Sequence, residues 1–290
     1  MKTAILGAGK MGAWFAKFCR EEGDHVVLAD RNKEKLEKLR QELGVEAASF
    51  EDAVRGADRV MICVSIGAFE EVVKKIAPAV REGQPVMDIC SVKAFPVKVM
   101  HEHLKQGLVL GTHPVFGPGS SGVKHKAFIL TPTNAKEQEF AEGYKKWLER
   151  EQARVFIMSP ERHDGLMAVV LGLPHFLGLA ACDTLLDQAN FPETKKVAGT
   201  TYRMLFTLAE VAALETPDLI ASLQLHLPEL EKIEELFMAK AQEWLDLVKR
   251  KDSAAIAKRM EQLKAKMTAV DRDYAESYEL MYRMLEATEE

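Results

Sequence analysis

Short apolar runs alternate with longer amphipathic stretches through the first half of the chain. The apolar runs predict strands at residues 3–6, 25–29, 59–64, 85–89, 108–110, 127–130 and 154–157. Between the first two, residues 11–22 place Met11, Trp14, Phe15, Phe18 and Cys19 at the 3.6-residue spacing of a helix. Strands that alternate with helices predict an α/β fold, a doubly wound parallel sheet with helices on both faces.

From about residue 159 the pattern predicts helices alone. Thr216 and Pro217 are typical of the cap and the first residue of a helix. After Asp252 and Ser253, positions 256, 260, 263, 267, 270, 274, 277, 281 and 284 alternate spacings of four and three. This predicts a heptad-like seam along one long helix. The helix either packs on its own domain or forms a subunit interface, which its length and methionine content favour.

Composition and charge narrow the class of protein. The chain is 47% hydrophobic and 29% charged, with a net charge of −5 and no polybasic patch, so we expect a soluble globular protein that binds no nucleic acid. The longest apolar run, residues 166–181, is interrupted by Pro174 and is shorter than the roughly 20 residues of a membrane span. We expect it to form a buried core helix, with no membrane association.

The position of the first strand and the cysteine pattern bear on location. The chain begins directly with a predicted strand, so no signal peptide is expected. The four cysteines lack CxxC spacing, and no histidine cluster has the spacing of metal ligands. We therefore expect no metal site, no disulfide framework and a cytoplasmic location.

A glycine-rich motif joins the first predicted strand to the first helix, and its residues are Gly7-Ala8-Gly9-Lys10-Met11-Gly12. Its context is that of a Rossmann dinucleotide site. Gly7 permits a tight turn, Gly9 lets the backbone approach a pyrophosphate, and Gly12 lets the helix and strand pack closely. The N-terminus of the helix also attracts phosphate. We expect these six residues to bind a dinucleotide cofactor.

Asp30 lies at the end of the next predicted strand, where a carboxylate accepts hydrogen bonds from an adenosine ribose and repels a 2′-phosphate. NAD is therefore favoured over NADP, while the adjacent Arg31 softens that preference. We expect a dinucleotide-binding (Rossmann) domain at residues 1–158. An all-α domain for substrate binding and dimerisation is expected at residues 159–290.

Polar residues follow other predicted strands at the edge of the sheet where ligands bind in such folds. Ser65 follows the strand at 59–64 and is expected beside the cofactor. Ser91 and Lys93 follow the strand at 85–89. Ser91 is expected to hydrogen-bond the substrate or cofactor, and an N-cap for the following helix is the alternative.

His113 comes after the strand at 108–110, and an imidazole in that place suits a general base. A structural histidine is the alternative. Pro114, Gly117, Pro118 and Gly119 make the loop after it, with backbone that is either preset or free of Cβ hindrance. We expect Gly117 to border the substrate.

Three segments together resemble those of prephenate dehydrogenases: Asp88-Ile89-Cys90-Ser91-Val92-Lys93, then His113-Pro114-Val115-Phe116-Gly117-Pro118, then His163-Asp164 with Leu173-Pro174-His175. The resemblance covers nearly the whole chain and implies NAD-dependent oxidative decarboxylation of prephenate to 4-hydroxyphenylpyruvate in tyrosine biosynthesis. It implies that His113 takes the proton of the ring hydroxyl and that Ser91 orients that hydroxyl. It further implies that His175 contacts the substrate from the helical domain. For His175, a core histidine bonded to a backbone carbonyl is the alternative.

The chain departs from the family pattern at one position. Prephenate dehydrogenases commonly carry an arginine for the substrate carboxylate six residues before a helix-starting proline; here that proline is Pro217, and Val211 precedes it by six. Arg203, on the same predicted helix, is the expected substitute because a guanidinium grips a carboxylate with two hydrogen bonds. An ordinary surface arginine is the alternative, and Lys93 is a second candidate cation.

Other functions share parts of this pattern. An arogenate dehydrogenase has nearly all these features, since arogenate carries an amino group where prephenate has a keto group. A 3-hydroxyacid dehydrogenase or an imine reductase has the same two-domain plan, but the first needs a lysine base near the start of the helical domain, where only Lys145 and Lys146 lie close. The non-enzyme alternative is a nucleotide-sensing or dimerisation module. We expect the enzyme, as a homodimer formed through the helical domain.

Overall fold

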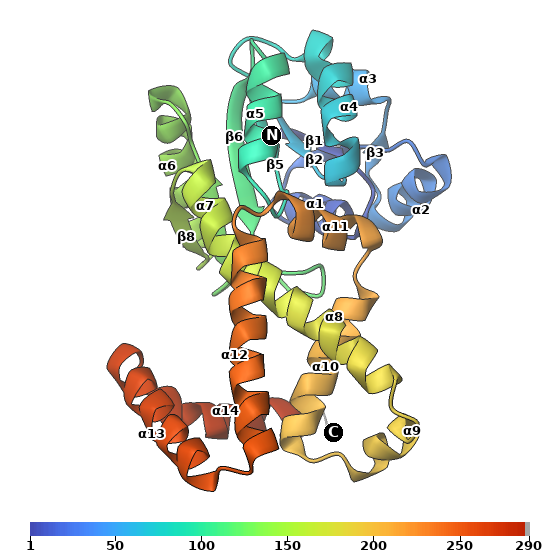
Figure 1. The fold of residues 1–290 in the computed structure, drawn as a ribbon. Coiled ribbons are helices and arrows are strands. Elements are labelled where there is room, and N and C mark those ends of the chain that lie inside the picture. The colour runs from blue at the N-terminus through green and yellow to red at the C-terminus, as the bar shows by residue number, and fades with distance from the viewer. Residues whose placement is uncertain (288–290) are drawn as a thin grey trace. The chain divides into compact units, whose positions relative to one another are not determined.

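The chain folds into two compact units, and Figure 1 labels most of their elements. The structure is a computed structural model that describes residues 1–287. The first unit contains residues 1–168 and 216–228, and the second contains residues 169–215 and the chain from 229 onward. The domain boundary predicted after residue 158 lies just before α7 (Pro160–Met167), a helix that belongs to the first unit. Helix α11 (Pro217–His226) also belongs there, because it packs on α4 (Ile66–Ile76).

An eight-stranded sheet forms the centre of the first unit, in the order β3-β2-β1-β4-β5-β6-β7-β8. Adjacent strands are parallel except for the antiparallel pair β6–β7. The predicted doubly wound sheet is thus confirmed, as a mostly parallel one. Its strands are β1 (Lys2–Leu6), β2 (His25–Ala29), β3 (Glu46–Ala47), β4 (Arg59–Ile62), β5 (Pro85–Asp88), β6 (Leu108–Pro114), β7 (Ala127–Thr131) and β8 (Arg154–Ile157).

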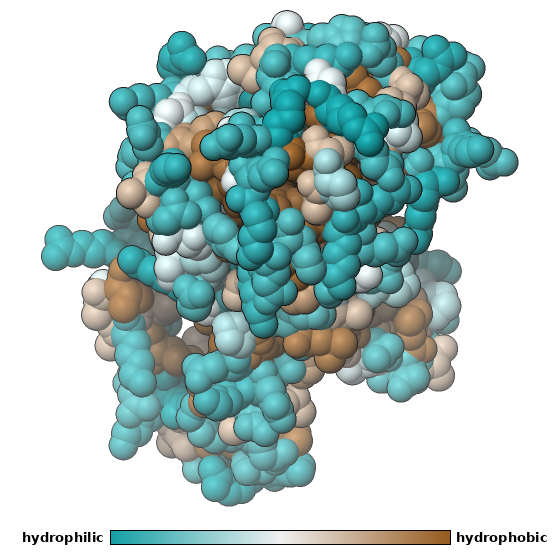
Figure 2. Space-filling view, turned by 90° about the horizontal axis from the view of Figure 1, so that it is seen from above, coloured by the Kyte–Doolittle hydropathy of each residue, from teal (hydrophilic) through white to brown (hydrophobic). Residues whose placement is uncertain are grey.

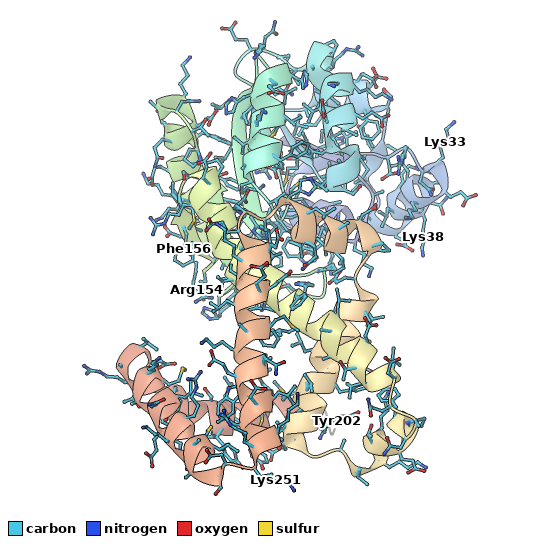
Figure 3. All side chains as sticks on the ribbon, in the orientation of Figure 1. Lys33, Lys38, Arg154, Phe156, Tyr202 and Lys251 are labelled. Carbon is cyan, nitrogen blue, oxygen red and sulfur yellow. The ribbon has the colours of Figure 1, made fainter. Side chains whose placement is uncertain are left out.

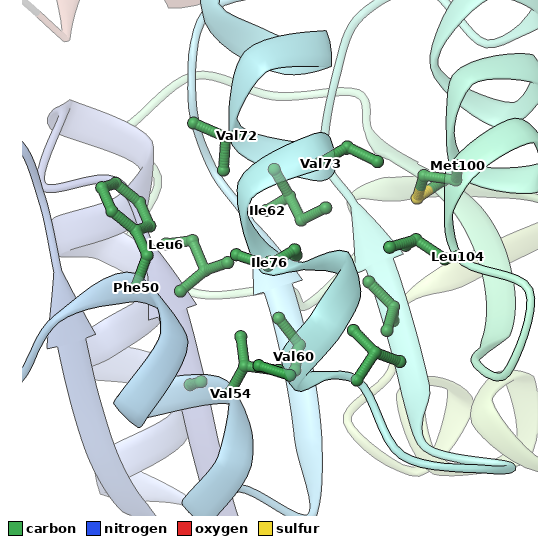
Figure 4. Close-up of a cluster of buried hydrophobic side chains, with 14 of the residues drawn as sticks. Leu6, Phe50, Val54, Val60, Ile62, Val72, Val73, Ile76, Met100 and Leu104 are labelled. Carbon is green, nitrogen blue, oxygen red and sulfur yellow. The ribbon is translucent and has the colours of Figure 1, made fainter.

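Helices cover both faces of the sheet because successive strand residues face opposite sides. Ala4 and Leu6 of β1 join a core with α3, α4 and α5, whereas Ile5 joins a second core with α1 and α6. Figure 4 shows the first core, in which Ile62 of β4 and Ile76 of α4 lie. The remaining helices of this unit are α1 (Lys10–Glu21), α2 (Lys33–Leu43), α3 (Phe50–Gly56), α5 (Ala94–His103) and α6 (Ala135–Arg150), with a 3₁₀ turn at Ala77–Ala79.

Strand β6 is longer than the sequence predicts, and the difference matters for the site. Residues 108–110 were expected to form the strand, but β6 continues to Pro114 and pairs with β7, where His113 lies opposite Ile129. His113 is therefore inside a strand, at its carboxyl end, and not in the loop after it. The antiparallel partner provides the hydrogen bonds that extend the strand past Gly111.

One edge of the sheet is formed by the two-residue β3, and the other by β8. Arg154 and Phe156, both labelled in Figure 3, are exposed on this strand and alternate with buried Val155. A charged side chain on an edge strand disfavours pairing with another chain. The face of the molecule drawn in Figure 2 is covered mostly by hydrophilic side chains, with small apolar patches between them.

The second unit consists of helices throughout its described residues. Helix α8 approaches α10 closely at Gly178, where an added Cβ would lie 2.7 Å from the Cβ of Ala212. Much of the apolar surface of the second unit is exposed, including the side chains of Val211 and Leu214 in α10 and of Val248 in α12. The helices are α8 (Leu173–Leu186), α9 (Phe191–Thr194), α10 (Thr200–Leu214), α12 (Leu230–Arg250), α13 (Ser253–Val270) and α14 (Ser277–Glu286), with 3₁₀ turns at Lys195–Val197 and Tyr274–Glu276.

The predicted single helix along residues 256–284 is wrong. A helix begins at Ser253, where the Asp252 carboxylate accepts the N–H of Ala255 at 2.9 Å. Helix α13 ends at Val270, and α14 begins at Ser277. Asp271 adopts an extended backbone conformation, and its carboxylate accepts the N–H of Asp273 at 3.0 Å. This local turn competes with the helix and divides the heptad-like seam into two segments.

Residues 166–181 are helical, as predicted, but the expectation that they form a buried core helix is wrong, because most of their side chains are at least partly exposed in this chain. A continuous helical segment, Pro160–Leu186, has a window of mean hydropathy 1.9 of which only 22% is buried, and by length and composition alone it meets the criterion for a membrane span. Its start is nevertheless part of the folded first unit, where Met167 and Ala168 are buried. A π-helical turn at Ala168–Gly172 precedes Pro174, whose ring removes a helical N–H and crowds the carbonyl one turn back.

Candidate active site

The glycine motif forms the turn between β1 and α1 and leaves room for a ligand. Gly7 has φ of +119°, which favours glycine, and its N–H donates to the Ala29 carbonyl at 2.8 Å. A Cβ on Gly12 would collide with the Gly7 carbonyl. A Cβ on Gly9 would instead meet no heavy atom of the described chain within 4 Å. The open side of Gly9, at the N-terminus of α1, fits the approach of a pyrophosphate.

Asp30, at the carboxyl end of β2, holds this loop in place. Its Oδ2 accepts the N–H of Ala8 at 2.6 Å, and its Oδ1 accepts the N–H of Asn32 at 2.6 Å. Each oxygen has a further lone pair with which to accept a ribose hydroxyl. Arg31 and Lys10 are exposed, and Met11 packs partly against the core of the sheet. Ser65 is exposed at the start of α4, where its side chain makes no cap hydrogen bond.

The loop after β6 is fastened to the helix that begins at the glycine motif. The indole N–H of Trp14 in α1 donates to the Ser120 carbonyl at 2.7 Å, and the Trp14 ring contacts Phe116 at a centroid distance of 5.0 Å. Gly117, between these two contacts, is exposed. The predicted substrate loop and the predicted nucleotide loop are therefore joined through α1.

A buried imidazole pair lies at the carboxyl end of β6. His113 Nδ1 is 2.8 Å from Nε2 of His163 in α7, and His163 Nδ1 is 2.7 Å from Oδ1 of Asp164. The exposed fractions of His113, His163 and Asp164 are 3%, 0% and 1%. The two oxygens of Asp164 also accept the N–H groups of Lys93 and Ala94 at 2.6 and 2.8 Å. Asp164 thus joins the start of α5 to the histidine pair.

Electrostatics keep both imidazoles neutral near neutral pH. Burial lowers the pKa of His113 well below its ordinary value, and the nearby His163 and Lys93 lower it further. Burial also lowers the pKa of His163, against the opposing effect of the Asp164 carboxylate. A neutral imidazole is the form that accepts a proton, so His113 can act as a base at neutral pH without first losing a proton.

The expectation that Lys93 binds a substrate carboxylate does not fit its geometry. Its side chain is fully buried, and its ammonium pairs with the Asp88 carboxylate and donates to the Thr112 carbonyl at 2.6 Å. Both partners lie in the sheet, one at the end of β5 and the other beside His113 in β6. The charge of Lys93 is therefore neutralised inside the first unit.

Ser91 lies half-buried in the short segment between β5 and α5. The alternative that it caps α5 is wrong, because the N-cap residue of that helix is Lys93. Its neighbours Lys93 and Ala94 are bonded to Asp164, the residue that also holds His163. Ser91 and His113 are thus attached to one hydrogen-bonded group of residues.

His175 and Arg203 belong to the second unit. His175 Nδ1 donates to the Leu171 carbonyl at 2.7 Å, the backbone bond that the structural alternative expected, and this leaves Nε2 as the acceptor nitrogen of the neutral ring. Arg203 is half-buried on α10, one residue after Tyr202, which Figure 3 labels. Val211, where the family commonly has an arginine, is 49% exposed on the same helix.

Sequence reasoning assigned no role to His163 or Asp164, although both belong to the segments that carry the family resemblance. The sequence signal that could have identified them is the adjacent pair His163-Asp164. His163 is fifty residues from His113 along the chain, however, and this separation does not indicate that the two side chains are in contact. Within residues 1–287, no group of three or more His, Cys, Asp or Glu side chains has the arrangement of a metal site.

Two family models match the chain. Residues 15–157 match the model described as prephenate dehydrogenase, nucleotide-binding domain, and residues 159–268 match that described as prephenate dehydrogenase, dimerization domain. A protein of Methanocaldococcus jannaschii described as probable arogenate/prephenate dehydrogenase is 34% identical over 264 residues, which cover 90% of this chain and 59% of that protein. The prephenate dehydrogenase of Bacillus subtilis is 26% identical over 227 residues, which cover 72% of this chain and 61% of that protein.

Solved structures give the same result. The prephenate dehydrogenase of Aquifex aeolicus in complex with hydroxyphenyl propionate and NAD+ has a TM-score of 0.76 at 28% identity, covering 93% of this chain and 98% of that one. The chain spans about 59% of the length of the archaeal relative, so it matches that protein in part. Because the two models match consecutive stretches that together cover most of the chain, the protein belongs to the prephenate dehydrogenase family.

Proposed function

We propose that this chain catalyses the NAD-dependent oxidative decarboxylation of prephenate to 4-hydroxyphenylpyruvate, a step of tyrosine biosynthesis. The observation that carries the proposal is His113, an imidazole buried at the carboxyl end of β6, in a unit whose glycine loop fits a dinucleotide; burial lowers its pKa, which favours the proton-accepting form. Family membership supports the class of reaction. The complex of the Aquifex aeolicus prephenate dehydrogenase with NAD+ and hydroxyphenyl propionate supports the choice of cofactor and of an aromatic ligand.

The residues of the glycine loop would hold the cofactor, with the pyrophosphate at Gly9 and the adenosine ribose at Asp30. The carboxylate of Asp30 favours NAD, since a 2′-phosphate would be repelled by it. When bound, NAD supplies the acceptor for the hydride that leaves the hydroxyl-bearing carbon of the ring. Gly7, Ala8, Lys10, Met11, Gly12, Arg31 and Ser65 complete the proposed cofactor site.

His113 takes the proton of the ring hydroxyl while the hydride leaves the ring carbon that bears this hydroxyl. Loss of carbon dioxide then makes the ring aromatic, and the phenolate oxygen takes the proton back. A positioned base contributes about 10²–10⁴-fold to such a step. Ser91 orients the hydroxyl, and Gly117 borders the ring. His175 and Arg203 contact the substrate from the helical unit, Arg203 at a carboxylate.

Arogenate is the second candidate substrate. The archaeal relative is described by both activities, and Val211 stands where prephenate dehydrogenases commonly have an arginine. We propose prephenate first because His113 and Ser91 act on the ring, which the two substrates share, while Arg203 provides a cation for the side-chain carboxylate. The choice therefore depends on the contacts of the side chain, where the two molecules differ.

We also propose a homodimer formed through the helical unit, in the cytoplasm. The uncovered apolar side chains of α10 and α12 support self-association, since large exposed apolar patches are typical of interfaces. The four free cysteines agree with a reducing compartment. Light scattering coupled to size exclusion would give the mass of a dimer, and a monomer at micromolar concentration would contradict this proposal.

The test of function measures initial rates of NADH or NADPH formation with prephenate and with arogenate, together with release of carbon dioxide. We expect NADH and carbon dioxide in equal amounts from prephenate, and kcat/KM for prephenate at least about tenfold above that for arogenate. The reverse preference would reassign the substrate to arogenate. If neither NAD nor NADP is reduced with either substrate, the proposal that the chain is a dehydrogenase is refuted and a nucleotide-sensing module is favoured.

Arg203→Ala separates the substrate cation from an ordinary surface arginine. Loss of a charge-assisted contact should raise KM for prephenate about tenfold or more with a small change in kcat, since the contact is made in ground state and transition state alike. The matched control is Lys195→Ala, which removes an exposed cation of the same unit that pairs with Glu210. Equal KM values for prephenate in the two variants would show that Arg203 does not bind the substrate carboxylate and is an ordinary surface arginine.

A further inference from the structure

The hydrogen bonds around His113 determine which of its ring nitrogens carries the proton. They form a single row: His113 Nδ1 to His163 Nε2 at 2.8 Å, then His163 Nδ1 to Asp164 Oδ1 at 2.7 Å. Every member of the row is buried, so water does not compete for these bonds. The directions of donation along such a row are coupled, because a neutral imidazole has one donor and one acceptor nitrogen.

Asp164 fixes the direction at one end. Its oxygens already accept the N–H groups of Lys93 and Ala94 at the start of α5, so the carboxylate serves as an acceptor on both sides. His163 must then donate its Nδ1–H to Asp164, which leaves its Nε2 with a lone pair. That lone pair accepts the Nδ1–H of His113. The opposite direction would place a bare ring nitrogen against a carboxylate oxygen at 2.7 Å, where both atoms are acceptors.

We propose that His163 and Asp164 are positioning residues that hold His113 in the Nδ1–H tautomer, with the lone pair of Nε2 available to the substrate hydroxyl. The inference rests on the proposed function in taking His113 as the base. When Nε2 accepts the proton, the imidazolium that forms keeps its Nδ1–H on His163, and Asp164 supplies a negative charge one residue further. The other charges near the pair, Lys93 before α5 and Asp88 in β5, neutralise each other.

The arrangement also links the base to Ser91. Asp164 accepts the backbone N–H groups of the two residues that follow this serine by two and three positions, so α7 holds both His163 and the segment after Ser91. The row therefore fixes two features of the proposed site: the tautomer of the base and the start of the helix beside it.

The test reads the tautomer directly, by NMR of the ring nitrogens in protein labelled on histidine. The chain has eight histidines, and His113 is assigned by the loss of its signals in His113→Asn. We expect Nδ1 of His113 to be protonated and Nε2 to be bare in the protein as purified. In His163→Leu, which cannot accept the bond, both tautomers should appear, and kcat should fall about tenfold or more with KM for prephenate changed less than about threefold.

Two further variants distinguish positioning from folding. His163→Gln offers an amide oxygen to His113 Nδ1–H and should recover most of kcat together with the Nδ1–H tautomer. Asp24→Asn is the matched control, since it weakens a buried ion pair with Arg59 at 2.7 Å, at the amino-terminal ends of the strands of the same sheet, whereas His113 lies at a carboxyl end. It should lower stability and leave the His113 tautomer unchanged.

The outcomes separate this inference from the proposed function. A proton on Nε2 of His113 in the wild-type protein overturns the inference even if prephenate is oxidised. His163→Leu with wild-type kcat also overturns it. A protein with the Nδ1–H tautomer that oxidises neither prephenate nor arogenate refutes the function alone, because the NMR measurement needs no turnover. Should His163→Leu fail to fold, the wild-type tautomer and the rate of His163→Gln still decide the question.

Discussion

The ammonium of Lys93 is enclosed within the first unit, and its removal by Lys93→Met tests that placement quantitatively. Methionine keeps the length of the apolar stem and removes the charge. Asp88 would then retain one partner for Oδ1, the N–H of Cys90 at 2.8 Å, while its Oδ2 has no hydrogen-bond partner within the described residues even with the lysine present. The variant therefore leaves a buried carboxylate without a countercharge.

Breaking a buried ion pair by removing one partner costs about 3–5 kcal/mol. Proteins have a total free energy of unfolding of about 5–15 kcal/mol, so this loss is a large fraction of the stability. The free energy of unfolding of the variant should therefore be measured at low temperature, by urea denaturation monitored by circular dichroism. Adding Asp88→Asn to Lys93→Met removes the unpaired charge and should restore at least about 2 kcal/mol of the lost free energy of unfolding. A double-mutant cycle measures this coupling between the two substitutions. Lys98→Met, at an exposed lysine of α5, should change stability by less than about 0.5 kcal/mol.

The same variants decide whether Lys93 meets the substrate. A buried structural cation predicts that KM for prephenate in the double variant Lys93→Met with Asp88→Asn stays within about threefold of wild type. The reasoning is refuted if Lys93→Met is as stable as Lys98→Met while KM rises tenfold or more. That result would place the ammonium at the substrate carboxylate, as the sequence allowed.

Three further predictions concern the cofactor site and pH. Gly9 has φ of −73°, and a Cβ added there would meet no neighbouring atom of the described chain, so Gly9→Val should lower the free energy of unfolding by only about 1 kcal/mol. The valine side chain should nevertheless raise the Kd for NAD at least about tenfold, because it would occupy the place of the pyrophosphate. An unchanged affinity in titration calorimetry would contradict this prediction. Asp30→Asn keeps an acceptor for the Ala8 N–H and removes the charge, so the kcat/KM ratio of NAD to NADP should fall about tenfold, and a constant ratio would remove Asp30 from cofactor choice. Because burial lowers the pKa of His113 and His163, the unfolded chain binds more protons at these two residues below a pH of about 6.5. Their contribution to the free energy of unfolding should be constant above that pH and should fall below it by up to about 1.4 kcal/mol per pH unit for each histidine. The slope below a pH of about 6.5 should be shallower in His113→Asn than in the wild type, and equal slopes would contradict the assignment.

The periodicity of the chain was sufficient for the alternation of strands and helices in the first unit, because buried parallel strands and amphipathic helices have distinct apolar spacings. It was insufficient where pairing partners decide the structure. The extension of β6 to Pro114 depends on hydrogen bonds from β7, which no local pattern contains. The break of the seam falls at Asp271, whose carboxylate accepts the N–H of Asp273; this turn is local, but the apolar spacing that predicted one long helix does not reveal it.

The candidate site was predictable where a motif dictates backbone geometry, as at Gly7–Gly12 and Asp30. It was less so where burial decides the role of a charge. Lys93 is near Ser91 in sequence and in the predicted crevice, yet its side chain turns into the sheet toward Asp88, five residues earlier. The partner of His113 could not be identified from spacing, since α7 follows two strands and a helix after β6. Such contacts depend on the tertiary fold.

The central claim, that His113 is the base of a dehydrogenase, is tested most directly by kcat and NAD affinity of His113→Asn. The asparagine amide can replace the Nδ1–H donor toward His163 but has no second ring nitrogen to accept a proton, so the fold and the nucleotide site are retained. We expect kcat with prephenate to fall about 10²–10⁴-fold while the Kd for NAD stays within about twofold. An unchanged kcat would contradict the claim.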